Sequence, residues 1–238
     1  MNLFIADIKS IISAPSRLCA LLSPVIFTLF LLYLFPFISG FNRPEDALSY
    51  GRYYSLTAIT LVSAIPFIYG ILFSFVHLKE VHPLSSGRAD VRIPGTKSIL
   101  ISRMAISSVL SFILVLPVIY ITGAVSSEGW LRGIYAAFLL AITAPFIFIF
   151  STCFSHDRKS WKIISLISVI FLITVPSGLL LHHPWNYFIF FSPFYWTGWA
   201  WVITSPAESI VYGMISLAIT AIFSLICFRD LIRNSGIV

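Results

Sequence analysis

Residues 131–154 read LRGIYAAFLLAITAPFIFIFSTCF, and Arg132 is the single charged side chain among them. A helix of about 20 apolar residues rises about 1.5 Å per residue and so crosses a hydrocarbon core of ~30 Å. Lipid offers no partner for backbone N–H and C=O groups, so a crossing segment satisfies them within itself as an α-helix. This stretch therefore predicts a transmembrane helix.

Five further stretches share this character, and the bulk composition agrees with them. Hydrophobic residues make up 58% of the chain and charged residues 10%, whereas a soluble domain carries about 25% charged residues. Soluble globular proteins, disordered tails and nucleic-acid modules are therefore excluded. We predict an all-α, polytopic membrane protein with one domain over residues 1–238. The six expected spans are Leu18–Ser39, Ser55–His77, Ile99–Gly123, Leu131–Phe154, Ile163–Leu181 and Ser209–Phe228.

The N-terminal segment, residues 1–16, has a different pattern. Phe4, Ile8 and Ile11 recur at helical spacing among polar positions. We expect an amphipathic helix that lies on the membrane surface. An extension of the first span is the alternative. A charged start followed directly by a short apolar stretch is missing, so a cleaved signal peptide is not predicted.

Lysine and arginine are distributed unevenly between the two sides of the predicted bundle. Consecutive connections alternate between the sides, so one side collects twelve of the 15 basic residues and the other only Arg43, Arg52 and Arg132. Loops rich in Lys and Arg stay in the cytoplasm. The sequence thus predicts a multi-pass protein of the cell (inner) membrane with both termini, including the basic tail 229–238, on the cytoplasmic side.

The connection Leu181–Pro206 is rich in aromatic residues and contains neither Lys nor Arg. Pro184 and Pro193 interrupt it, so we expect one or two short re-entrant or interfacial helices that are half-buried in the outer leaflet. Trp and Tyr favour that interface, and an aromatic belt is one interpretation. An outer gate for a lipid-like substrate is the other, with these candidate residues: Trp185, Tyr187, Phe194, Tyr195 and Trp196.

The connection Lys79–Lys97, KEVHPLSSGRADVRIPGTK, is the longest hydrophilic stretch on the predicted inner side. It mixes both charge signs and is long enough for a short helix across the membrane surface. A solvated loop is one interpretation of it. A docking element for a cytoplasmic partner is the other.

Residues for chemistry inside the membrane are scarce. Ionisable residues within spans mark function, yet Glu80 and Arg103 lie at the inner boundary of the spans, and Glu208 lies at the outer one. His182 and His183 are adjacent, so on a helix they point about 100° apart and rarely share one metal ion. We therefore predict no catalytic, cofactor-binding or metal-binding residues, and we interpret Cys19, Cys153 and Cys227 as small buried apolar side chains.

Taken together, these segments resemble a known family. A basic amphipathic N-terminal helix precedes six spans, an acidic residue and a proline (Glu80 and Pro94) bracket the segment after the second span, and the chain ends in RDLIRNSGIV. This architecture resembles the permease subunits of ABC-2 type ATP-binding-cassette exporters. It is most similar to the small fluoroquinolone-export-type permeases. The spacing from Glu80 to Pro94 is longer than is usual in that family.

The resemblance implies a transport subunit rather than an enzyme. Two such permeases form a homo- or heterodimer, and each docks on a cytoplasmic ATPase subunit that hydrolyses ATP. The predicted partners are thus an ABC ATPase, a second permease and membrane lipid, with no nucleic acid and no cofactor. The residues that the resemblance implies for docking, in or near the coupling helix, are Glu80, His82, Arg88, Asp90, Arg92 and Pro94.

The residues themselves leave three hypotheses open. The spans carry little charge, which favours an exporter of an apolar or amphipathic substrate (drug, lipid or peptide). A membrane scaffold or assembly protein that moves nothing is the second hypothesis. A membrane enzyme is the third, and its polar cluster would have to come from Glu208, His182 and His183.

Overall fold

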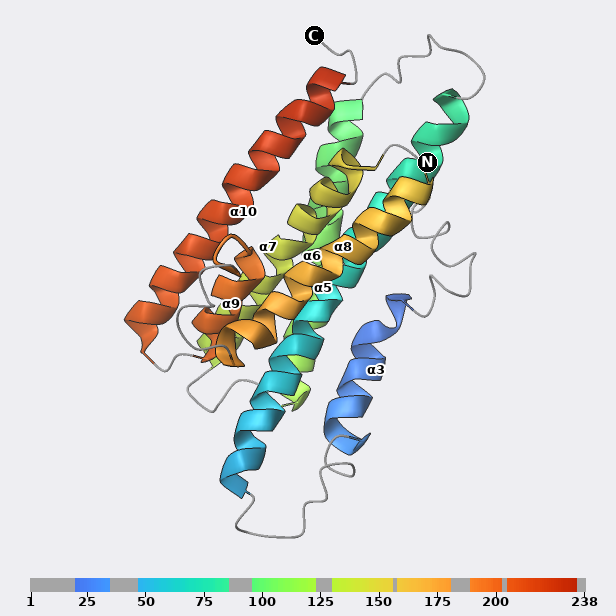
Figure 1. Ribbon diagram of the computed structural model, residues 1–238. Coiled ribbons are helices and arrows are strands. Elements are labelled where there is room, and N and C mark those ends of the chain that lie inside the picture. The colour runs from blue at the N-terminus through green and yellow to red at the C-terminus, as the bar shows by residue number, and fades with distance from the viewer. Residues whose placement is uncertain are drawn as a thin grey trace.

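The computed structural model describes residues 20–34, 47–85, 96–122, 130–155, 158–180, 189–202 and 205–234 (Figure 1). Nearly all of these residues are helical, and none of them forms a strand. The predicted all-α class is confirmed. The elements, in chain order, are α3 (Ser23–Leu29), the π-helical turn η1 (Phe30–Leu34), α5 (Ala47–Ser85), α6 (Thr96–Thr122), α7 (Trp130–Cys153), α8 (Arg158–Leu180), α9 (Pro193–Val202) and α10 (Pro206–Asn234).

Five of these helices contain a stretch long and apolar enough to cross a membrane, and each corresponds to one predicted span. These stretches are Leu56–Leu78, Ser98–Thr122, Trp130–Cys153, Lys159–Ser177 and Pro206–Leu231. Of the first predicted span, the structure describes the apolar helix Ser23–Leu34. Residues 18–19 and 35–39 of that span and the expected surface helix at residues 1–16 lie outside the described residues.

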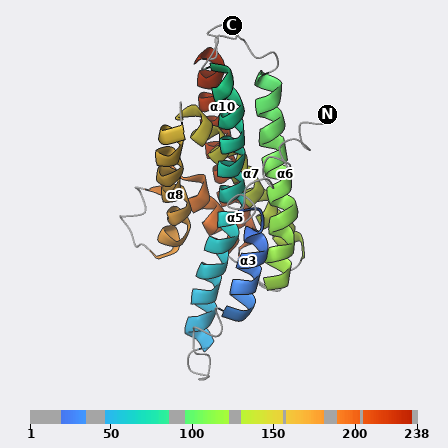
Figure 2. The same ribbon diagram turned by 90° about the vertical axis from the view of Figure 1, so that its right-hand side faces the viewer.

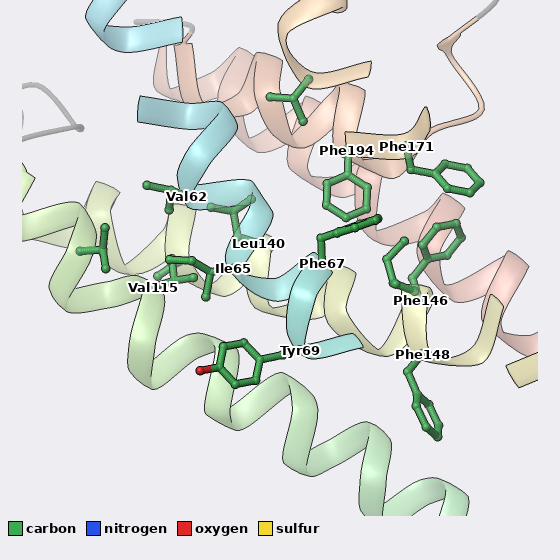
Figure 3. Packing of buried hydrophobic residues seen from close by; sticks show 14 of the residues in the cluster. Val62, Ile65, Phe67, Tyr69, Val115, Leu140, Phe146, Phe148, Phe171 and Phe194 are labelled. Carbon is green, nitrogen blue, oxygen red and sulfur yellow. The ribbon is translucent and has the colours of Figure 1, made fainter. Parts of the chain in front are cut away.

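Two helices, α5 and α7, form the centre of the bundle. Their apolar stretches are 72% and 67% buried, whereas those of α6, α8 and α10 are 22–28% buried. Gly70 brings α5 and α7 together, because a Cβ atom there would stand 2.6 Å from the Ala144 carbonyl oxygen. Small residues permit such close approach of helices in membranes. Figure 3 shows the core that results, with side chains from α5, α6, α7, α8 and α9.

The outer helices present large apolar side chains on the surface. Leu166 of α8 is 72% exposed, Leu225 of α10 is 68% exposed and Val109 of α6 is 57% exposed. Exposed apolar faces of this extent are not stable in water, and in a membrane they contact lipid. The chain is therefore a multi-pass membrane protein.

The bundle has two distinct ends. At one of them α5, α7 and α10 end and α6 and α8 begin (Figure 1). We call it the basic end, because the described residues Arg103, Lys159, Lys162 and Arg229 lie in the adjoining helical turns. At the opposite end α6 and α8 finish (Figure 2) and α7 and α10 start. The short helix α9 lies at this end and packs against α8 and α10 (Figure 1).

Candidate functional site

The predicted docking segment joins α5 to α6 at the basic end. Glu80 and His82 lie within α5, which continues as a helix to Ser85, about 10 Å past the end of its membrane-crossing stretch. The structure describes no side chain for either residue. Arg88, Asp90, Arg92 and Pro94 lie outside the described residues. The docking role of all six residues stays a prediction.

A buried polar pair lies just inside this segment, between its two flanking helices. Arg103 of α6 is completely buried, and its Nη1 lies 3.1 Å from Nδ1 of His77 on α5. His77 is itself buried. Its ring also contacts that of Phe148 on α7 edge-on, with the ring centroids 6.0 Å apart. The pair therefore joins three helices at the basic end.

The chemistry of the pair fixes how its hydrogen bond is made. A guanidinium group has donors and no acceptor, so Arg103 donates and Nδ1 of His77 accepts. The imidazole that accepts at Nδ1 is neutral and carries its proton on Nε2. Arginine stays charged in proteins, so a single positive charge is held inside the bundle, where charged side chains are expensive and mark function.

A second contact ties α5 to α8 one helical turn away. The indole Nε1 of Trp161 donates to the Ser74 hydroxyl over 2.9 Å, and the same indole contacts the ring of Phe75 at a centroid distance of 4.8 Å. Ser74 and His77 are three residues apart, so they lie on one side of α5. The last membrane-crossing turns of α5 are thus attached to α6, α7 and α8 by specific polar and ring contacts.

At the opposite end, α9 is the short helix expected between the fifth and sixth spans. It is more buried than the sequence predicted, because it folds into the bundle and packs against α8 and α10. Phe194 is fully buried, and its ring contacts that of Phe67 on α5. Tyr195 is also buried and Trp196 is partly buried, whereas Trp185 and Tyr187 lie outside the described residues. A gating role for these five residues stays a prediction.

Hydroxyl groups hold α9 in place. Thr197 and Ser216 of α10 share a hydrogen bond of 2.8 Å, and Ser216 also donates to the Pro193 carbonyl over 2.9 Å. At the other end of α9, Nη2 of Arg132 donates to the Trp201 carbonyl over 3.1 Å. A cation at the C-terminal turn of a helix is favourable, because that end carries partial negative charge.

The three residues considered for chemistry are only partly described by the structure. Glu208 is exposed in the first turn of α10, and His182 and His183 lie outside the described residues. Within the described ranges, no three His, Cys, Asp or Glu residues are grouped so that they would hold a metal ion. Cys153 of α7 and Cys227 of α10 lie near each other and are not joined in a disulfide.

The sequence matches a known family of membrane proteins. The family described as fluoroquinolones export permease protein Rv2686c-like matches residues 7–228. The chain belongs to this family. No curated protein and no solved structure matches it.

Membership in the Rv2686c-like family identifies the chain as an export permease, and the role is transport rather than catalysis. The match runs over all the described helices except the last turns of α10. It therefore includes the Lys79–Lys97 connection, the buried Arg103–His77 pair and α9.

Sequence reasoning missed the pairing of Arg103 with His77. Both residues were visible as ionisable side chains near the ends of consecutive spans. An arginine inside an antiparallel pair of membrane helices needs a polar partner, and His77, at a similar depth on the neighbouring helix, was available. Ser74 and Trp161 gave no comparable signal, because each residue type is ordinary in a membrane helix.

Proposed function

We propose that this chain is the membrane-spanning subunit of an ABC-2 type exporter whose ATP is hydrolysed by a separate cytoplasmic ATPase. Two permease subunits, identical or different, form the membrane part, and the basic end faces the cytoplasm. The Lys79–Lys97 connection docks on the ATPase. The substrate is apolar or amphipathic, of the drug, lipid or peptide class.

The observation that carries this proposal is the Arg103–His77 pair. The docking connection joins α5 to α6, and the pair fastens those two helices together within the last turns before they leave the membrane. A displacement of the connection by the ATPase therefore moves α5 and α6 as a unit. Because Phe148 and Trp161 contact the same turns of α5, the displacement reaches α7 and α8 as well.

Transport then follows from the two states of the bundle. ATP binding favours the arrangement in which the ATPase subunits are closed, and the helices shift to the arrangement compatible with that closure. At the far end α9 must move for a substrate to leave between α8 and α10. Each hydrogen bond that holds α9 contributes about 1 kcal/mol, and the buried ring contact of Phe194 with Phe67 has to shift as well.

The direct experiment is a pull-down of the tagged chain in mild detergent, followed by mass spectrometry and an ATPase assay. We expect one co-purifying subunit that contains a phosphate-binding loop and hydrolyses ATP. A second six-span chain in the eluate would indicate a heterodimer. Purification of the chain alone, without ATPase activity even after crosslinking in native membranes, would refute the proposal.

The docking assignment has its own test. Glu80→Lys and Arg92→Glu reverse charges in the connection, and we expect both to abolish partner-stimulated export while the chain still inserts into the membrane. Lys162→Glu is the matched control, because Lys162 is exposed at the same end but lies on α8. Normal export by both connection variants would remove these residues from the docking surface.

A further inference from the structure

A groove runs between α6 and α10 in the half of the bundle nearest the basic end. It has a volume of about 430 Å³, which lies within the range of about 300–1,000 Å³ typical of small-molecule sites. Met104 and Ala105 of α6 form one wall, Leu225 and Phe228 of α10 form the other, and Pro145 of α7 lies between them. The lining is almost entirely apolar.

The groove exists because α6 and α10 each pack on α7, and their outer faces diverge from it. Ile101, Met104, Ala105 and Ser108 are spaced so that they share one face of α6. A smaller hollow of about 230 Å³ shares Ala105 with the groove, and its other lining residues, such as Val109 and Ile113, lie on a neighbouring face of α6. The α6 wall of the groove itself extends from Ile101 to Ser108, about 10 Å along the helix, in the direction in which an acyl chain lies in a bilayer.

Positive charge marks the end of the groove nearest the membrane surface. Arg229 is exposed and lies one helical turn beyond Leu225 on the same face of α10. Asp230, the residue after Arg229, is also exposed, and it points about 100° away from Arg229 around the helix.

We propose that this groove holds an acyl chain of an anionic phospholipid, with Arg229 at its headgroup. An apolar groove that opens to lipid and ends near an exposed cation at the headgroup level matches such a molecule in both shape and charge. A lipid without a net negative charge would gain no binding energy from the positive charge of Arg229. The site is separate from the transport role and is occupied whether or not an ATPase is attached.

The test measures the lipid that stays on the purified full-length chain. The tagged protein is extracted from native membranes, washed stepwise in mild detergent and analysed by mass spectrometry for phospholipid per chain. We expect about one anionic phospholipid to survive the washes. Ala105→Phe, which fills the groove from an exposed position, should lower retention to background. Leu225→Trp, which narrows the groove from the opposite wall, should do the same even if the first variant folds poorly.

Two controls separate this site from general lipid contact. Leu166→Phe enlarges an equally exposed apolar side chain on α8 and should leave retention unchanged. On delipidated protein supplied with phosphatidylglycerol or phosphatidylcholine, Arg229→Gln should reduce the preference for the anionic lipid about fivefold, the effect of one basic residue near a membrane surface. Lys162→Gln removes a charge at the same end and should leave that preference intact.

The outcomes that overturn the inference are distinct from failure of the exporter proposal. Retained lipid with the same headgroup composition as the bulk membrane would remove the role of Arg229. Equal retention by the wild type, Ala105→Phe and Leu225→Trp would remove the groove as the site. Neither measurement involves the ATPase, so each result stands whatever the pull-down shows.

Discussion

The strength of the Arg103–His77 contact can be measured by a double-mutant cycle. Arg103→Met keeps much of the side-chain length and removes the charge. His77→Phe keeps a flat ring against Phe148 and removes the acceptor. The cycle compares these two variants, their combination and the wild type, and it isolates the pairwise energy from the other contacts of each residue.

The structure sets the expected magnitude. Hydrogen bonds between membrane helices contribute about 0.6 kcal/mol on average and at most about 1.7 kcal/mol, and bonds to charged groups in soluble proteins contribute about 1.5–3 kcal/mol. Arg103 is fully buried and its bond to His77 is 3.1 Å long, so we expect a coupling energy of about 1–2 kcal/mol. His77→Phe should cost more than Arg103→Met, because it leaves a buried charge without one acceptor.

The assay is unfolding of the purified chain in mixed micelles by titration with a denaturing detergent, followed by circular dichroism. Lys162→Met, at an exposed lysine on the same end, is the control and should change the free energy of unfolding by less than about 0.5 kcal/mol. Additivity of the two single variants within about 0.5 kcal/mol would refute a direct interaction. Export per folded chain, measured with the ATPase present, should fall in Arg103→Met by more than the loss of stability explains.

Two other contacts give sharp predictions about the packing. Gly70→Ala should lower the free energy of unfolding by about 1–3 kcal/mol, because the new Cβ would stand 2.6 Å from the carbonyl oxygen of Ala144 on α7. Gly198→Ala is the matched control in the same unfolding assay, because the nearest atom to its Cβ would be 3.5 Å away. Mild oxidation of the purified chain should join Cys153 to Cys227, because the two residues lie near each other on α7 and α10. Mass spectrometry of the peptides detects the link, and a predominance of other pairings would contradict this helix packing.

The sequence was sufficient for the spans but not for their arrangement. Apolar length alone located the five described membrane-crossing stretches, because the backbone must be satisfied within each helix. Hydropathy did not distinguish α5 and α7, which are sheltered, from the lipid-facing helices. In a membrane the two surroundings are equally apolar, so the distinction depends on close contacts such as that of Gly70 with α7.

Of the candidate site, the sequence predicted the short helix α9 but neither its burial nor the contact between Arg103 and His77. Pro184 and Pro193 correctly indicated that the connection before the last span is interrupted and contains a short helix, and in the structure that helix begins at Pro193. Its burial was not evident, because an aromatic belt and a buried aromatic helix have the same composition. The contact between Arg103 and His77 depends on the rotation of α5 and α6 about their axes, and no residue pattern in a single sequence determines that angle.

The buried Arg103 also gives the protein an electrical property. Its charge lies about 8 Å inside the start of the α6 stretch at Ser98, and so within the field across the membrane. A full crossing of one charge is worth about 2.3 kcal/mol per 100 mV. If α6 shifted by one turn, about 5.4 Å of a core of ~30 Å, a potential of 100 mV would contribute only about 0.4 kcal/mol to the free energy of that shift. Export should therefore depend weakly on membrane potential, even though a charged side chain lies on the moving helix.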